Sequence, residues 1–197
     1  FITLLFILLF LFIFIQVQAV TLVFSKLGLS PHGAVLLLIS SLFGSMVNLP
    51  LFSIQTDLPA QKPQTWPIPK TAHFQQQPFT GNTVIAINAG GGLIPVGFSL
   101  YLIHIHDLPI LTVVTSITLI GLISFITSRP VTGMGIGMPI LIAPISAAII
   151  ALLLDTNQAA PLAYIGGTLG VLFGADLMRL HDIRNMSIPM ASIGGAG

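Results

Sequence analysis

Four short stretches of this chain combine residue types that suit ligand binding or chemistry. The first is Asn88-Ala-Gly-Gly-Gly-Leu-Ile-Pro95, where three glycines and a proline interrupt an apolar segment. Such residues unwind a helix, and freed backbone groups at membrane depth are tolerated only inside a protein or beside water. The stretch predicts close helix packing, an ion or solute site in a broken helix, or a hinge without a ligand. Its candidate ligand-binding residues are Asn88, Gly90, Gly91 and Gly92.

The second stretch, Arg129-Pro-Val-Thr-Gly-Met-Gly-Ile-Gly-Met-Pro139, has glycine at alternate positions. This pattern predicts a loop or a re-entrant segment, and a plain connecting loop is the simpler interpretation. Consecutive N–H groups beside Arg129 would also suit an anion. The Lys-Ser/Thr pair that completes a phosphate-binding loop is absent. The candidate residues of this stretch are Thr132, Gly133 and Gly135.

The third stretch places Gly166, Gly170 and Gly174 four residues apart, followed by Asp176. Small residues at this spacing form one smooth helix face, which predicts close packing against another helix. Burying a carboxylate near the end of a membrane helix costs free energy unless the carboxylate is paired with a cation or contacts water. Arg179 lies three residues on and could pair with it on the same face. The alternative is a functional carboxylate, so Asp176 and Arg179 are both ligand-binding candidates.

The fourth stretch is His104-Ile-His106-Asp107. These side chains would share a side for metal binding only in an extended backbone. A wet loop at the membrane interface is the favoured interpretation, so His104, His106 and Asp107 are weak metal candidates. We expect no metal and no other cofactor. No nucleophile-elbow, zincin or dinucleotide-binding motif is present, so an enzyme is not the favoured class.

The elements that must position these residues are predicted by composition. Of 197 residues, 54% are hydrophobic and only 6% are charged, against about 25% charged in soluble domains. So few charges could not cover a water-exposed surface, which indicates a membrane protein. The net charge of +1 offers no basic patch for nucleic acid. The expected partners are membrane lipid, other membrane subunits or a second copy of the chain.

The apolar runs predict an all-α fold, a polytopic transmembrane bundle of about six spanning helices of roughly 20 residues each. We expect them at residues 1–24, 31–52, 83–103, 108–127, 138–154 and 159–178. The chain then divides into two N-terminal helices (1–52), a Pro/Gln-rich loop outside the membrane (53–82), and a four-helix core with the start of a further segment (83–197). The first run resembles a signal peptide, but Val20 to Phe24 continue it, which favours a retained helix.

The basic residues predict the orientation of this bundle. With the N-terminus inside, the outer loops hold only Lys26. Cytoplasmic loops carry an excess of Lys and Arg, so we expect a cytoplasmic N-terminus. The inner loops then hold Lys62, Lys70, Arg129, Arg179 and Arg184.

Several phrases resemble one known family, the small prokaryotic membrane proteins catalogued as domain of unknown function 1614. The resemblance covers about residues 83–197. It implies a multi-pass protein of a bacterial or archaeal cytoplasmic membrane, with no established activity. It also implies a chain that continues beyond Gly197 into another hydrophobic helix with an Asp near its start. The phrases are Asn88–Pro95, Arg129-Pro-Val-Thr-Gly-Met-Gly-Ile, Gly167-Thr-Leu-Gly170, Gly174-Ala-Asp-Leu177 and Ala191-Ser-Ile-Gly-Gly-Ala-Gly197.

Three functions fit these observations. The favoured one is binding or transport of an ion or small solute through the glycine-broken helices. The second is an accessory or scaffolding subunit, supported by the smooth glycine face and the scarcity of polar residues. The third is an intramembrane aspartyl protease, because Gly174-Ala-Asp176 resembles part of such a motif. A carboxylate dyad needs two acids that share a proton, and only one is present here.

Overall fold

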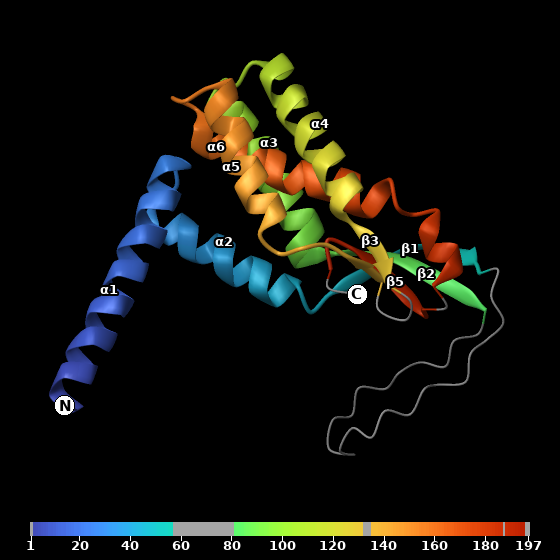
Figure 1. Ribbon diagram of the computed structural model, residues 1–197, viewed down its shortest axis with the longest axis horizontal. Coiled ribbons are helices and arrows are strands. Elements are labelled where there is room, and N and C mark those ends of the chain that lie inside the picture. Colours follow the sequence, from blue (N-terminus) through green and yellow to red (C-terminus); the bar gives the residue numbers. More distant parts are fainter. Residues whose placement is uncertain (1, 57–80, 132–134, 187, 196–197) are drawn as a thin grey trace.

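The computed structural model describes residues 2–56, 81–131, 135–186 and 188–195. Within these ranges the chain is mostly helical, with two small sheets at one end of a helix bundle (Figure 1). The expected all-α class is therefore corrected by the presence of strands. The described helices are α1 (Ile2–Lys26), α2 (Pro31–Gly44), α3 (Ile94–Ile105), α4 (Ile110–Thr127), α5 (Ile142–Leu154) and α6 (Ala159–Ile165).

In the described part of the chain, four helical turns are wider or tighter than an α-helix. Three π-helical turns precede α3 or follow α6, and together with those helices they make two longer helical rods. A 3₁₀ turn lies near the C-terminal end of the described chain. These turns are η1 (Ala89–Leu93), η2 (Gly166–Gly170), η3 (Leu172–Leu177) and η4 (Asp182–Asn185).

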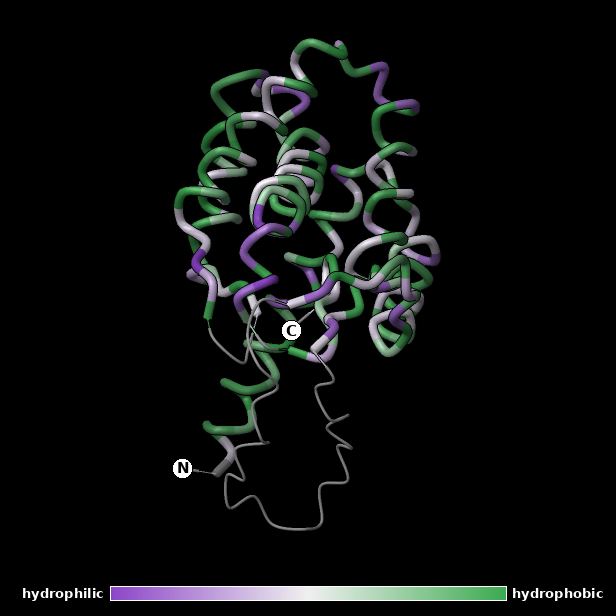
Figure 2. The backbone as a smooth tube through the Cα atoms, turned by 90° about the vertical axis from the view of Figure 1, so that its right-hand side faces the viewer, coloured by the Kyte–Doolittle hydropathy of each residue, from purple (hydrophilic) through white to green (hydrophobic). Residues whose placement is uncertain are grey.

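Three helices among the described residues are long and apolar enough to cross a membrane. They are Thr3–Lys26, Ile110–Thr127 and Ala159–Leu177. The other apolar helices, Pro31–Gly44, Ala89–Ile105 and Ile142–Leu154, are shorter. Figure 2 shows hydrophobic residues along most helical turns and hydrophilic ones gathered near the C-terminus. The described chain therefore supports a membrane location through three candidate spans.

The larger sheet replaces parts of two expected helices. Strand β1 (Asn48–Gln55) pairs antiparallel with β2 (Asn82–Asn88), which pairs parallel with β5 (Met190–Ile193). The helices expected at 31–52 and 83–103 are thus wrong over 48–52 and 83–88. The β2 sequence is rich in β-branched residues, which favour strands, and short apolar runs do not distinguish strand from helix. Pro50 sits beside a bulge in the edge strand, a position where proline is tolerated.

The second sheet is a short hairpin within the second candidate stretch. Strands β3 (Arg129–Val131) and β4 (Gly135–Gly137) pair antiparallel. Thr132 and Gly133 lie outside the described residues. The expected loop therefore contains extended backbone on both sides of that gap.

The bundle core lies among α3, α4, α5 and the rod formed by α6, η2 and η3. Leu102, Leu162 and Ile165 are fully buried there. Helix α1 stands outside, where it contacts α2 and α6. No residue in the candidate span of α1 is buried. A helix that is hydrophobic on all sides and uncovered by protein is typical of a membrane span.

The two ends of the bundle differ. The short connections from α1 to α2, α3 to α4 and α5 to α6 lie at one end, and the strands lie at the other (Figure 1). Lys26 closes α1 at the first end, while Arg129 begins β3 at the strand end. The fold thus separates a loop end from a strand end, and the candidate residues Asn88 and Asp176 belong to the strand end.

Candidate functional site

Asn88 organises the point where β2 turns into η1. Its side chain is almost fully buried, with 4% exposed. The Oδ1 atom accepts a hydrogen bond from Gly91 N at 2.8 Å, so Asn88 caps the first turn of η1. The Nδ2 atom donates to Ser45 O at 2.8 Å and to Asn48 Oδ1 at 3.0 Å. Asn88 and Asn48 face each other because the sheet register pairs them.

The three glycines after Asn88 allow close backbone contacts. Ser41 Oγ donates to Gly90 O at 2.6 Å, which ties η1 to α2. Gly91 lies against Gly194, whose φ of +71° places it in the left-handed region. A Cβ at Gly91 would overlap the carbonyl oxygen of Gly194. The run of glycines therefore brings α2 and the turn after β5 against the start of η1.

Asp176 joins the same place from the end of η3. Its Oδ2 atom accepts a hydrogen bond from Gly194 N at 2.7 Å. Two residues before Gly194, within β5, Ser192 Oγ donates to Asn48 Oδ1 at 2.6 Å. Four segments far apart in sequence thus meet. We call the group of Asn48, Asn88, Asp176, Ser192 and Gly194 the polar junction.

The polar junction lies between a small cavity and an open groove. The cavity has a volume of about 40 Å³ and is lined by Asp176, Ser192, Gly135 and Gly195 together with apolar side chains, mostly isoleucines. The groove runs along α2 and reaches Asn48, Asn88 and the glycines. Gly195 borders both spaces. Both spaces therefore reach the turn that follows β5.

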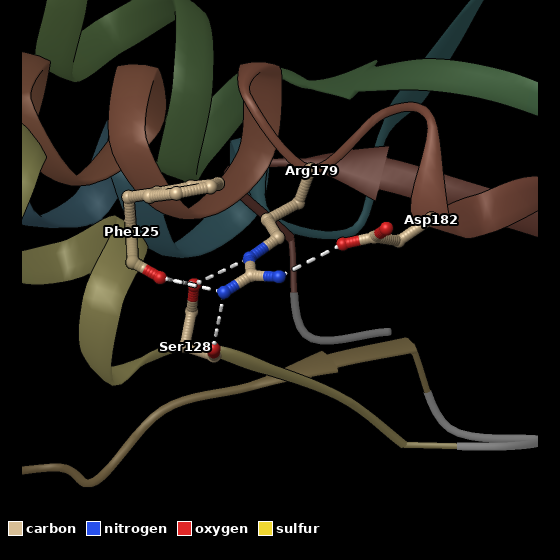
Figure 3. A network of polar contacts seen from close by, with 4 residues as sticks. All are labelled: Phe125, Ser128, Arg179 and Asp182. Carbon is tan, nitrogen blue, oxygen red and sulfur yellow. Dashed lines mark hydrogen bonds and ion pairs between the residues drawn. The ribbon is translucent and has the colours of Figure 1, made fainter.

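Arg179 does not pair with Asp176, so the ion pair considered for these residues is wrong. Its Nη1 atom contacts Asp182 Oδ2 at 2.9 Å. The guanidinium also donates to Phe125 O at 2.7 Å and to Ser128 O at 2.9 Å, and it lies 4.4 Å from the centre of the Phe125 ring (Figure 3). These carbonyls end α4, where cations stabilise a helix. Arg179 anchors the end of α4, and its donors are engaged by protein groups.

The glycine face of the long rod is covered within the chain. Gly166, Gly170 and Gly174 lie against α4, and a Cβ at Gly166 or Gly174 would overlap Ser116 or Gly121. Helices approach this closely only through small residues. The face that supported an accessory subunit is therefore not free to bind one.

The remaining candidates are not brought together. His104 lies in α3, and His106 ends that helix with its Nε2 atom 3.4 Å from Leu27 O. Asp107 follows with a φ of +46°. Within the described ranges, no three His, Cys, Asp or Glu side chains gather in one place. These residues occupy the loop end of the bundle, away from the polar junction.

Sequence reasoning missed Asn48, Ser192 and Gly194 as site residues. Asn48 shows no local signal, because its role follows from the strand register that places it opposite Asn88. Ser192 and Gly194 belong to a phrase that contributed only to the family resemblance. The pairing of two asparagines at strand ends would have been a usable signal once strands were recognised.

Comparison with known proteins identifies the family. The family model described as "Protein of unknown function (DUF1614)" matches residues 42–197. This match covers more than half of the chain, so the chain belongs to that family, and the resemblance found in the sequence is confirmed. No curated protein and no solved structure matches the chain.

Proposed function

We propose that this DUF1614 family member binds an ion or small polar solute at the polar junction and carries it across the membrane. The observation that supports this most directly is the position of Asp176. It lies at the end of the candidate span Ala159–Leu177 and lines a cavity. Its one hydrogen bond within the described chain comes from a backbone N–H. Carboxylates in such segments mark ion and substrate paths.

The backbone around Asp176 and Asn88 supports the same proposal. Asn88 caps one π-helical turn and Asp176 lies within another, and such turns occur frequently at functional sites. Broken helices leave polar backbone groups near bound ions and substrates in transporters. The groove beside Asn88 and the cavity beside Asp176 give such a ligand a place to enter and a place to bind.

The accessory-subunit function has lost support, and the intramembrane-protease function has gained none. The accessory-subunit hypothesis had two supports, the scarcity of polar residues and a smooth glycine face, and α4 covers that face. The protease hypothesis requires a second carboxylate beside Asp176. The next acidic residue along the chain, Asp182, pairs with Arg179 instead.

The proposal includes a placement in the membrane. Helices α2 to α6, with their π-helical turns, run between the loop end and the strand end, while α1 extends outward from the loop end (Figure 1). With α1 as the first span, we propose six crossings. Arg129, Arg179 and Arg184 belong to the strand end and Lys26 to the loop end. The positive-inside rule then assigns the strand end and the N-terminus to the cytoplasmic side of a prokaryotic cytoplasmic membrane.

This placement is testable because the chain has no cysteine. Asn157→Cys at the loop end and Arg184→Cys at the strand end would each carry a unique thiol. In intact cells, a maleimide that cannot cross the membrane should label the first variant alone. Labelling of Arg184→Cys before lysis would invert the proposed orientation.

The binding site is tested by thermal unfolding of the purified chain with a panel of inorganic ions and small polar solutes. We expect at least one ligand to raise the unfolding midpoint, and Asp176→Asn to remove the increase. Asp107→Asn is the matched control, because it also removes one carboxylate but lies in the loop end at a left-handed φ that Asn tolerates. An increase that survives Asp176→Asn would place binding elsewhere. Flux of the ligand into proteoliposomes then tests transport.

A further inference from the structure

We infer that the ligand of the polar junction is a single monovalent alkali cation, held by Asp176 in the adjacent cavity. The inference rests on the proposed function and names its ligand class. It follows from four properties of the described residues: the sign of the charge, the size of the cavity, the number of acidic groups and the types of oxygen atom.

The charge of the junction selects a cation. Asp176 is its one ionisable side chain, and the salt bridge found within the described chain joins Arg179 to Asp182 instead. The guanidinium of Arg179 is further engaged by the end of α4. A carboxylate that has no cationic partner among the described residues and lies in a poorly solvated site attracts a positive ion strongly and repels anions.

The size of the cavity selects a small ligand. Its volume is about 40 Å³, and about 10–15 Å³ of such space holds one water molecule. A small ion therefore fits there together with about two water molecules. Sugars, amino acids and quaternary ammonium ions do not fit.

The number of acidic groups argues against a divalent ion. Calcium and magnesium sites combine several carboxylate and other oxygen ligands. The cavity lining offers the single carboxylate of Asp176, and in the described ranges no cluster of three metal-binding side chains exists. A single negative charge matches a single positive one.

The oxygen atoms are arranged for a hard cation. Gly194 N–H binds Oδ2 of Asp176, which orients the carboxylate and leaves Oδ1 for the ion. Ser192 donates its hydroxyl proton to Asn48, so the lone pairs of Ser192 Oγ can face the cavity. Asn48 is held in turn by Asn88. Asp176 and Ser192 are therefore ligands, while Asn48 and Asn88 are positioning residues.

The test measures the unfolding midpoint of the full purified chain in LiCl, NaCl or KCl against choline chloride at equal ionic strength. We expect a saturable increase with at least one alkali cation, of roughly 5–10 °C at a hundredfold excess over Kd. Choline is too large for the cavity and serves as the baseline. Replacing chloride by gluconate should change nothing, because the charge at the junction excludes anions.

Variants separate binding from folding. Asp176→Asn should abolish the cation-dependent increase while keeping its midpoint in choline chloride. Ser192→Ala should raise Kd about tenfold, and Asp107→Asn should leave Kd unchanged. If Asp176→Asn does not fold, Asp176→Glu replaces it: a retained carboxylate on a longer side chain should preserve the increase with an altered order among Li⁺, Na⁺ and K⁺.

Three results would overturn the inference. One is an equal midpoint in every salt, which indicates a cavity that holds only water. The second is an increase that Asp176→Asn leaves intact, and the third is an order among the cations that Asp176→Glu does not alter. If another solute gives an increase that depends on Asp176, the cation inference fails and the proposed site survives. If no ligand does, both fail. Cation binding without flux would support the inference and refute transport.

Discussion

Two glycine-rich regions of this chain perform opposite tasks. Gly166, Gly170 and Gly174 press the long rod against α4 over a largely apolar face. The glycines at 90–92 instead bring polar groups together from β1, η3 and the turn after β5. Both regions use the missing Cβ for close approach. The difference shows that the residues beside the glycines decide whether close approach produces packing or a site.

The spacing and the flanking residues explain the difference. Glycines four residues apart share one helix face, so they shape a contact along the whole rod. In consecutive glycines the missing Cβ atoms face different sides of the helix, so several neighbouring segments can approach the backbone at once. Asn88 then supplies the cap that holds the opened turn. A packed face needs no such cap, and the rod has none.

The largest expected effect is on the packed face. In Gly174→Ala, the new Cβ would overlap the backbone of Gly121, and backbone cannot move aside as a side chain can. We expect a loss of about 3 kcal/mol, as for severe overpacking, seen as a lower thermal unfolding midpoint. Gly97→Ala is the control, because no atom lies within 4 Å of its Cβ. Equal midpoints for the two variants would refute a tight contact at Gly174.

A smaller and more local effect is expected at the polar junction. Asn88→Ala removes the η1 cap, the side-chain donor to Ser45 O and one of the two donors to Asn48 Oδ1. The expected cost is about 2 kcal/mol. Hydrogen–deuterium exchange should show lost protection at the Gly91 amide. If protection falls equally along α4, the junction is a part of the bundle core and not a separate unit.

Arg179 follows η3 and holds it against the end of α4. Arg179→Lys keeps the charge but loses the planar fork that reaches two carbonyls and Asp182. We expect a loss of about 1 kcal/mol in the free energy of unfolding, measured by denaturant titration in detergent. Arg184→Lys, at an exposed position, should be neutral. Equal effects of the two variants would show that Arg179 contributes charge alone.

The smallest effect, and the one of opposite sign, concerns Ser124 on α4. Its Oγ is the one buried side-chain polar atom without a hydrogen-bond partner in the described chain. Ser124→Ala should stabilise the protein by about 0.5 kcal/mol, because it removes an unsatisfied buried hydroxyl. A higher unfolding midpoint would support a dry interface there. A lower midpoint would mean that this hydroxyl has a hydrogen-bond partner outside the described residues.

The long apolar runs were predictable. The helix expected at 108–127 is α4 at Ile110–Thr127, and the one expected at 159–178 is the rod that ends at Leu177. The strands at 48–55 and 82–88 were not, because a short apolar run has the same composition in either structure. Whether such a run forms a strand or a helix is decided by the pairing of β1 with β2, and these two segments lie far apart in sequence.

The site was predictable in its parts and not in its connections. Asn88 and Asp176 stood out because each is a polar residue in an apolar setting. The sequence-based ion pair of Asp176 with Arg179 was wrong, because neighbours along a helix were considered without the segments that pack against it. Arg179 instead meets the end of α4, and Asp176 meets Gly194.

The sequence by itself determined the apolar composition, the family resemblance and the three long candidate spans, because hydrophobicity over about 20 residues is a local property of the chain. Tertiary structure alone decided which polar groups meet. Asn48 and Ser192 bond across 144 positions, and no local pattern reports a contact of that range. The polar junction exists because β5 pairs beside β2 and the adjoining glycines let the backbones touch.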